Sequence, residues 1–495
     1  MSKKLLVGPL LGIESNTLYT ICFSTDRAAT HSNVYVNNEV IPAIKIQDTY
    51  SGSFWRAEFD IPVQQEAQAI NYTIRIGDKE ARDRHNRNTW KFHIPGETDT
   101  PRFAYASCNG FSSADLMTKT EDPYLLWDKM VCEHDEDPFS LLLMGGDQLY
   151  ADEIWSRVPT LNEWGELPRK TRITRKASKV MKSQIDRFYD ELYIKRWSNK
   201  SMSLIFASIP SVMMWDDHDI FDGWGSYPED IQNCDVYKNI FSVARKYFEN
   251  FQIRTIHNRS LINAGAGHYT MAFKYREYNL LAIDNRAERS LKQVMSKQQW
   301  EDVINYLKTS ATSGDMLLMS AVPIIYRDFS LTETVFDLTP WQEELTDDLK
   351  DHWRSKEHQG ERARLIMNLL ENVKQRQDDQ GCKTVILSGD VHIGCVGAVR
   401  DRRDANTRMI HQVVSSGIVH PPPSRIQWFG IMAVTNDRKE YLNEDETIDI
   451  RMLKPFGSRQ YIRSRSYVTL EKGADTKLWV NWVCELDDSP SFPLA

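Results

Sequence analysis

Beyond residue 101, short runs of apolar residues alternate with long amphipathic stretches. Five of the runs are FAYA, LLLMG, VMMW, LLAI and VILS, and in none of them do apolar and polar residues alternate. A strand that is apolar at every position is buried on both faces, as in a sheet covered by helices. The stretches that have the length and apolar spacing of helices are 176–196, 236–250, 294–308 and 360–377. We therefore predict an α/β fold, with a layered β-sheet core flanked by helices.

The first 98 residues have a different pattern. Short runs rich in β-branched and aromatic residues, such as TLYTICFST and INYTIRIGD, are separated by polar turns. Regular spacing of this kind predicts a small antiparallel β-sandwich, similar to an immunoglobulin domain, over 1–98. The linker PGETDTP follows it, and a catalytic domain is expected over 102–495. Within that domain we expect a helical insertion around 153–200 and further core strands between 408 and 484.

Composition excludes several classes of protein. The chain of 495 residues has a formal charge of −8 and 41% apolar residues, so we expect a globular protein with no nucleic-acid partner. No apolar run is long enough to span a membrane, and Gly8, Pro9 and Gly12 interrupt the N-terminal run that resembles a signal peptide. The seven scattered cysteines are typical of reduced thiols, which favours a cytoplasmic location. The oligomeric state is left open.

One basic stretch, RKTRITRKASKVMK at 169–182, stands out against this acidic balance. It is interpreted either as the solvated face of a helix or as a rim that attracts anions toward a site.

Residues able to bind metals or anions follow each of the five apolar runs. Ligands of open α/β sheets bind beyond the carboxyl ends of the strands, so these residues are expected at one edge of the sheet. A single aspartate after a strand is a common turn residue, but five such ends together are not explained by turns. Carboxylates that converge without matching arginines require cations, and two metal ions suit displacement at phosphorus. The residues are Cys108–Asn109, Asp147 with Tyr150 and Asp152, Asp216–Asp219, Asp284 with Arg286, and Asp390 with His392.

Three motifs in this order, GGDQLY, WDDHD and SGDVH, resemble those of the PhoD-like alkaline phosphatases, a branch of the calcineurin-like metallophosphoesterases. The resemblance covers nearly the whole chain. It extends to SCN at 107–109, IDNRAER at 283–289, KQQWEDVINYL at 297–307, Asp351 with Trp353, and SSGIVHPPP at 415–423.

The resemblance implies a set of metal ligands and two or more metal ions, iron with calcium. A histidine that the superfamily places near 315–325 is absent, and SAVP stands there, so the second metal position is expected to be rich in oxygen. Ligand chemistry alone leaves zinc, manganese and magnesium open. Cys108 as a buried thiol and Tyr150 as a packed aromatic residue are the alternatives to two of the assignments. The implied ligands are Cys108, Asp147, Tyr150, Asp217, Asp390 and His392.

The resemblance further implies that His218 contacts the phosphate or the leaving oxygen and acts as the catalytic acid; a purely structural pairing of His218 with Asp219 is the alternative. Asp219 is expected to orient His218, and Asp216 to support the site; the resemblance does not imply a direct metal bond for Asp216. Asn109 and Arg286 are candidates to bind phosphate oxygens. An ion pair between Arg286 and Asp284 is equally compatible with the sequence.

The sequence thus predicts a metal-dependent hydrolase of small phosphomonoesters or phosphodiesters. A hydroxide that bridges the metals would attack phosphorus in line while His218 assists the leaving group. The alternative from another class is a non-catalytic, metal-stabilised binding protein whose β-sandwich engages a partner.

Overall fold

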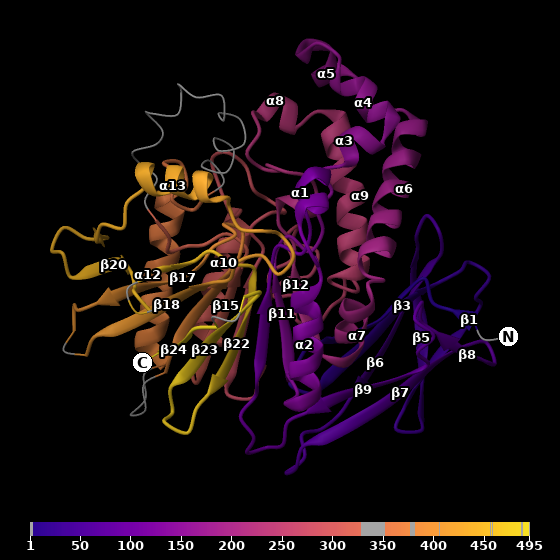
Figure 1. Cartoon of the computed structure of the whole chain (residues 1–495), viewed down its shortest axis with the longest axis horizontal. Coiled ribbons are helices and arrows are strands. Elements are labelled where there is room, and N and C mark those ends of the chain that lie inside the picture. The colour runs from indigo at the N-terminus through magenta and orange to yellow at the C-terminus, as the bar shows by residue number, and fades with distance from the viewer. Residues whose placement is uncertain are drawn as a thin grey trace.

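The computed structural model describes residues 3–327, 352–376, 382–404, 406–455, 457, 459–486 and 489–494. Asp351, which was compared with the family's D-x-W element, lies outside these residues. Two sheets and the helices around them make up the described fold (Figure 1).

The N-terminal part consists of strands that pair antiparallel, apart from the parallel pair β1–β8. Their order is β8-β7-β4-β5-β6-β3-β2, and β9 pairs with the free edge of β7. Burial alternates along β7, as expected of a strand with one face on a core. The bounds are β1 Lys3–Lys4, β2 Val7–Ile13, β3 Leu18–Thr25, β4 Ser32–Val36, β5 Glu39–Asp48, β6 Ser53–Asp60, β7 Gln68–Ile76, β8 Lys79–Arg82 and β9 Thr89–Ile94.

This sheet continues beyond the first 98 residues. Gly12 of β2 pairs with Ser211 of β12, and the Ser211 hydroxyl donates a hydrogen bond of 3.0 Å to the carbonyl of Leu11. The first sheet continues from there as β12-β11-β10-β22-β23-β24, in which β10, β11 and β12 are parallel. These strands are β10 Phe103–Ala106, β11 Leu141–Gly145, β12 Ser211–Met214, β22 Ser466–Lys472, β23 Leu478–Cys484 and β24 Ser491–Leu494.

The second sheet has the order β13-β14-β15-β16-β18-β17-β20-β19, with β21 paired to β17. Its central strands β14, β15, β16 and β18 are parallel and fully or almost fully buried. The bounds are β13 Met271–Tyr275, β14 Tyr278–Ile283, β15 Asp315–Ser320, β16 Thr384–Ser388, β17 Gly394–Asp401, β18 Arg408–Val414, β19 Glu440–Tyr441, β20 Ile448–Met452 and β21 Tyr461–Ile462.

The two sheets pack against each other, which corrects the expectation of a single sheet edge. The rings of Phe103 in β10 and Tyr278 in β14 lie 4.9 Å apart, and residues of both sheets share one apolar core. A second core lies between the other face of the second sheet and the helices α10 (Lys297–Thr309) and α12 (Gln359–Arg376). Strand ends from two sheets, not one, therefore converge on the site.

The chain between β11 and β12 is largely helical. Its helices are α3 Ile154–Arg157, α4 Pro159–Gly165, α5 Arg169–Thr174, α6 Lys179–Arg196 and α7 Lys200–Ser208. After β12 come the 3-10 helix η1 (Asp217–Asp219), α8 (Glu229–Gln232) and α9 (Asp235–Phe251), and α9 packs along α6. Figure 1 shows α3, α4, α5 and α8 beyond one end of β11 and β12. The remaining helices are α1 (Ala114–Lys119), α2 (Leu125–Glu136) and α13 (Arg425–Val434).

Four helices confirm the amphipathic stretches of the sequence. They are α6, α9, α10 and α12, each within a few residues of its predicted range. Ser178 caps α6 and Ser296 caps α10, and each side chain accepts a hydrogen bond from the backbone three residues on.

Candidate metal centre

The candidate site lies where strand ends of both sheets meet. The first sheet supplies three of these ends and the second sheet two. Cys108 and Asn109 follow β10, Asp147 follows β11, Asp216–Asp219 follow β12, Asp284 and Arg286 follow β14, and Asp390 and His392 follow β16.

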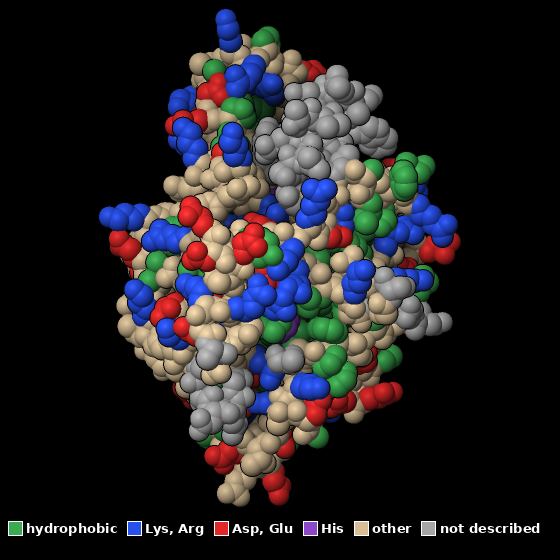
Figure 2. All heavy atoms as spheres, turned by 90° about the vertical axis from the view of Figure 1, so that its left-hand side faces the viewer, with side chains coloured by type: hydrophobic (Ala, Val, Ile, Leu, Met, Phe, Trp, Pro, Cys, Tyr) green, Lys and Arg blue, Asp and Glu red, His purple; other side chains and the backbone are tan. Residues whose placement is uncertain are grey.

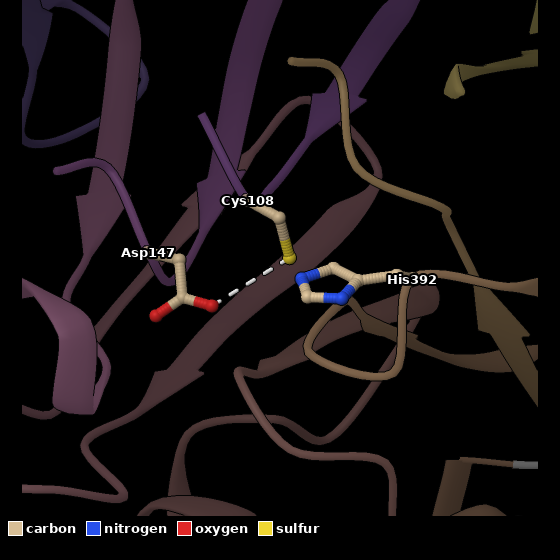
Figure 3. Close-up of side chains that lie close together, drawn as sticks. All are labelled: Cys108, Asp147 and His392. Carbon is tan, nitrogen blue, oxygen red and sulfur yellow. Dashed lines mark hydrogen bonds between the residues drawn. The ribbon is translucent and has the colours of Figure 1, made fainter. Parts of the chain in front are cut away.

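Three groups of donor atoms meet there, and Asp147 belongs to all three. In each group the donor atoms lie within 4.8 Å of one another. Figure 3 shows the first group, in which Cys108 Sγ lies 3.6 Å from Asp147 Oδ2 beside the imidazole of His392. We call these residues together the donor cluster: Cys108, Asp147 and His392; Asp147, Asp217 and His218; and Asp147, Asp216 and Asp390. It holds every predicted metal ligand except Tyr150.

Tyr150 borders the donor cluster and is packed at the same time. Its hydroxyl is 3.2 Å from Nε2 of His392, so it reaches the same space. Its ring stacks on His218 at 4.3 Å and lies 5.4 Å from the ring of His420. Both sequence interpretations, ligand and packed aromatic residue, match this position.

The backbone at four of these residues is in the left-handed region. The φ angles are +51° at Cys108, +54° at Asp147, +67° at Asp390 and +53° at His392. Residues other than glycine adopt this conformation at a cost, and such strain concentrates at functional sites. The sequence carried no signal for it, because none of the four is the glycine or asparagine that usually marks a left-handed position.

The electrostatics of the donor cluster favour a bound cation. Burial raises the pKa of Asp147 well above its usual value; the charge of His218 opposes this rise, and the neighbouring carboxylates of Asp216 and Asp217 add to it. Burial likewise raises the pKa of the Cys108 thiol, helped by the charge of Asp147. Asp147 Oδ1 is buried without a hydrogen-bond partner among the residues that the structure describes. An orphaned carboxylate oxygen amid like charges fits a metal ion, which would stabilise the deprotonated ligands.

His218 is oriented by Asp152 and not, as predicted, by Asp219. Nδ1 of His218 lies 2.9 Å from Oδ2 of Asp152, whose other oxygen accepts a hydrogen bond of 2.8 Å from the backbone N–H of Asp222. Burial alone would lower the pKa of His218, but the carboxylates of Asp152 and Asp217 outweigh burial and raise this pKa well above its usual value. Asp152 stands two residues after Tyr150 and was among the residues expected at the site, but no role was predicted for it.

Asp219 instead joins the loops after β11 and β12. Its carboxylate accepts hydrogen bonds from the backbone N–H groups of Gln148 (3.1 Å), Leu149 (3.1 Å) and Asp216 (2.9 Å), and from the side chain of Gln252 (2.9 Å). Burial raises the pKa of Asp219 to about 7, against the effect of these donors. Asp219 thus supports the site by fixing the two loops that carry Asp147 and Asp217.

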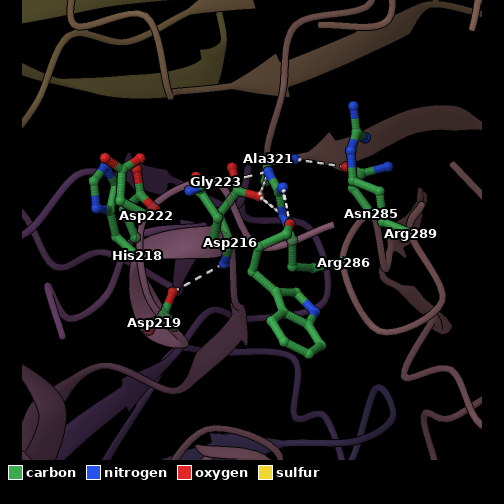
Figure 4. A network of polar contacts seen from close by, with 12 residues as sticks. Asp216, His218, Asp219, Asp222, Gly223, Asn285, Arg286, Arg289 and Ala321 are labelled. Carbon is green, nitrogen blue, oxygen red and sulfur yellow. Dashed lines mark hydrogen bonds and ion pairs between the residues drawn. The ribbon is translucent and has the colours of Figure 1, made fainter. Parts of the chain in front are cut away.

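Arg286 pairs with Asp216, which corrects both interpretations from the sequence. Arg286 Nε donates a hydrogen bond of 2.5 Å to Asp216 Oδ1, and Nη1 donates one of 2.8 Å to the carbonyl of Trp224 (Figure 4). Nη2 lies 3.7 Å from Asp217 Oδ1. Asp284 binds backbone N–H groups, including that of Arg286, and the Trp215 indole. Because Arg286 is fully buried in these contacts, it supports the carboxylates and does not present a phosphate-binding fork.

Asn109 is also placed differently from its prediction. Its Oδ1 accepts a hydrogen bond of 2.9 Å from the Trp127 indole, and its Nδ2 faces the Gln148 carbonyl and the sulfur of Met202. The amide is therefore used inside the fold. The structure does not bring Asn109 into the donor cluster, and its phosphate contact stays a prediction.

The family model of the PhoD related phosphatases matches residues 85–340 and 337–447. The chain belongs to the PhoD related phosphatase family. A Saccharomyces cerevisiae protein, the uncharacterized protein YGR266W, is 27% identical over 455 residues. The match covers 75% of this chain and 63% of the yeast protein, so this chain spans less than two thirds of that relative.

Solved structures share the fold of this PhoD related phosphatase at low sequence identity. The structure of PhoD has a TM-score of 0.62 at 14% identity and covers 99% of this chain and 89% of its own. The purple acid phosphatase PPD1 of yellow lupin (Lupinus luteus) has a TM-score of 0.52 at 11% identity and covers 98% of this chain and 74% of its own. These matches confirm the predicted α/β fold class.

The donor cluster adds to family membership a set of residues that could hold metal ions. Within the described part of the chain, no helix combines the length and the apolar character needed to traverse a bilayer.

Proposed function

We propose that this protein hydrolyses phosphoesters, monoesters or diesters of small molecules, with at least two metal ions held by the donor cluster. The observation that carries the proposal is the position of Asp147, a buried carboxylate shared by all three donor groups. A carboxylate in that position can bridge two ions. Bound metals would supply Lewis acidity and a water nucleophile near neutral pH.

The donor groups differ in chemistry, and they would suit two different kinds of metal ion. Cys108 and His392 share one donor group with Asp147, and the Tyr150 hydroxyl lies 3.2 Å from Nε2 of His392. Thiolate and imidazole favour a transition metal, iron by family resemblance or zinc by ligand type. The other two groups share Asp147 with the carboxylates of Asp216, Asp217 and Asp390, which suit calcium, manganese or magnesium.

His218 is proposed to protonate the leaving oxygen. Because Asp152 binds Nδ1, the protonated imidazole has Nε2–H as its other donor. The raised pKa favours the protonated form of this donor. Asp152 therefore fixes both the orientation and the charge of the acid.

The test combines metal analysis with turnover. The purified protein should contain bound metal and hydrolyse an aryl phosphomonoester or phosphodiester, and chelation should abolish both. Asp147→Asn should lose activity and metal, whereas the matched control Asp135→Asn, on the exposed face of α2, should lose neither.

Two outcomes would contradict the proposal. Activity that survives chelation and Asp147→Asn would exclude the metal mechanism. A protein with bound metal that turned over no phosphoester would favour the alternative, a metal-stabilised binding protein.

A further inference from the structure

A pocket lies away from the donor cluster, between α4, α5 and the segment that leads into α9. Its volume is about 360 Å³, which is within the size range of small-ligand sites. Four aromatic side chains line it, Trp155, Trp164, Tyr227 and Tyr237. The planes of Trp155 and Trp164 are nearly parallel, at 19°, with centroids 6.2 Å apart. We call this site the aromatic pocket.

The aromatic pocket contains polar groups that the fold leaves unused. Trp164 is 2% exposed, and its Nε1 is buried without a hydrogen-bond partner among the described residues. Nε of Arg172 is likewise buried without a hydrogen-bond partner among the described residues. The guanidinium of Arg172 lies 5.5 Å from the centroid of the Trp164 ring. Buried N–H donors are normally satisfied, so two unsatisfied donors on residues that line one pocket are unusual in a folded protein. Asn162 and Glu166 also line the pocket and offer acceptors of their own.

The basic stretch of the sequence lies beside this pocket. Within it, Arg169 pairs with Asp230 and Lys176 with Asp235, but Arg172 forms no ion pair with any described residue. Figure 2 shows Lys and Arg side chains gathered on the projecting lobe at the top of the molecule, the height at which Figure 1 places α4 and α5. Positive charge concentrated there, on a chain of net charge −8, favours an anionic ligand.

The pocket is joined to the catalytic loops through short contacts. The Trp155 ring meets that of Phe221 at 5.1 Å, three residues after His218. The Tyr227 hydroxyl donates a hydrogen bond of 2.8 Å to the carbonyl of Asp222, whose own N–H binds the Asp152 carboxylate. A ligand in the aromatic pocket would therefore lie close to the segment around Phe221 and Asp222, which is joined to the Asp152 carboxylate that orients His218.

We propose that the aromatic pocket binds a nucleotide. Its heteroaromatic ring stacks among the tryptophan and tyrosine rings, as bases do on aromatic side chains. Exocyclic amino or hydroxyl groups of the base meet Asn162 or Glu166. The phosphate faces Arg172 and the basic stretch. Binding itself does not depend on the proposed hydrolysis.

The test measures binding by titration calorimetry on the full-length chain with Asp147→Asn, which prevents turnover and weakens phosphate binding at the donor cluster. AMP should bind saturably, adenosine more weakly, and inorganic phosphate not measurably over the same concentrations. Arg172→Gln should weaken AMP binding about tenfold and adenosine binding less. Trp155→Leu should weaken both ligands about tenfold. Lys182→Gln, in the same basic stretch but outside the pocket, should change AMP affinity less than about twofold.

The inference fails if AMP does not saturate at millimolar concentration, or if Arg172→Gln and Trp155→Leu bind AMP like the parent. Inorganic phosphate that binds as tightly as AMP would show an anion site only and would overturn it as well. Hydrolysis of glycerol phosphate by the unmodified protein is measured in parallel. Activity without AMP binding refutes the nucleotide site alone, whereas AMP binding without activity refutes the proposed hydrolysis alone.

Discussion

Replacing Asp219 with alanine should destabilise the protein and empty the donor cluster, although Asp219 is not proposed to bind metal. The substitution removes the acceptor of four hydrogen bonds whose donors are all buried. A stranded buried donor costs about 1–3 kcal/mol, and water that enters the vacated space keeps the cost near the lower end. The free energy of unfolding of the metal-free protein should therefore fall by about 4 kcal/mol. That is a large part of the 5–15 kcal/mol typical of native proteins.

Asp219→Asn separates hydrogen bonding from charge. The amide keeps one oxygen acceptor but presents an NH₂ group to two of the donors, so about half of the loss, about 2 kcal/mol, is expected. Asp186→Ala is the matched control, because Asp186 on α6 forms a single half-exposed ion pair with Lys246 and should cost less than about 1 kcal/mol. Urea unfolding in the presence of a chelator measures all three variants, and elemental analysis measures the bound metal.

The metal content decides whether Asp219 acts through the loops. If Asp219 fixes the loops of Asp147 and Asp217, Asp219→Ala should bind less than half of the parent's metal. The reasoning is refuted if Asp219→Ala is no less stable than the Asp186→Ala control and retains its full metal content.

Three further predictions concern other buried charges. Asp152→Asn should lower kcat at least about tenfold with unchanged metal content, because His218 loses the carboxylate that orients and charges it; an unchanged kcat would exclude that role. Arg286→Gln should cost about 3–5 kcal/mol of stability in urea unfolding, since it leaves Asp216 buried without its ion-pair partner; a raised KM at full stability would instead indicate a phosphate contact. Burial lowers the pKa of His134 to about 4, so between pH 6.5 and pH 4 the unfolded chain takes up a proton that the folded chain does not. Stability should thus fall by about 2 kcal/mol between pH 7 and pH 5 on account of this group, and His134→Gln should remove that part of the dependence in urea titrations at the two pH values.

The sequence predicted the strands of the core and the residues at their ends because both are local properties. An unbroken apolar run marks a buried strand, and a cluster of donors after it marks the strand's carboxyl end. The division of these strands between two sheets was not predicted. It depends on the pairing of β10 with β22, which joins residues more than 350 positions apart, and on packing between sheets that leaves no local signal.

The contact between His218 and Asp152 was not predicted from the sequence, for a different reason. Asp219 follows His218 directly, so adjacency favoured it, but the two residues lie in a 3-10 helix, where successive side chains diverge by about 120°. Asp219 consequently binds the backbone of Gln148, while His218 faces Asp152, 66 residues away. The pairing of Arg286 with Asp216 spans 70 residues and was missed for the same reason. Neighbours in the sequence on an irregular turn are poor guides to contact.

Two independent features of the donor cluster imply the same occupant. Four of its residues adopt left-handed backbone angles, at a combined cost of about 4 kcal/mol or more. The cluster also buries Asp147 among like charges, so the side chains by themselves favour protonation or separation. Polypeptide interactions do not offset both costs, since Asp147 Oδ1 has no hydrogen-bond partner in the described residues. A bound cation would offset the electrostatic cost of burying Asp147 directly. By binding Cys108, Asp390 and His392 it would also hold the strained backbone in place.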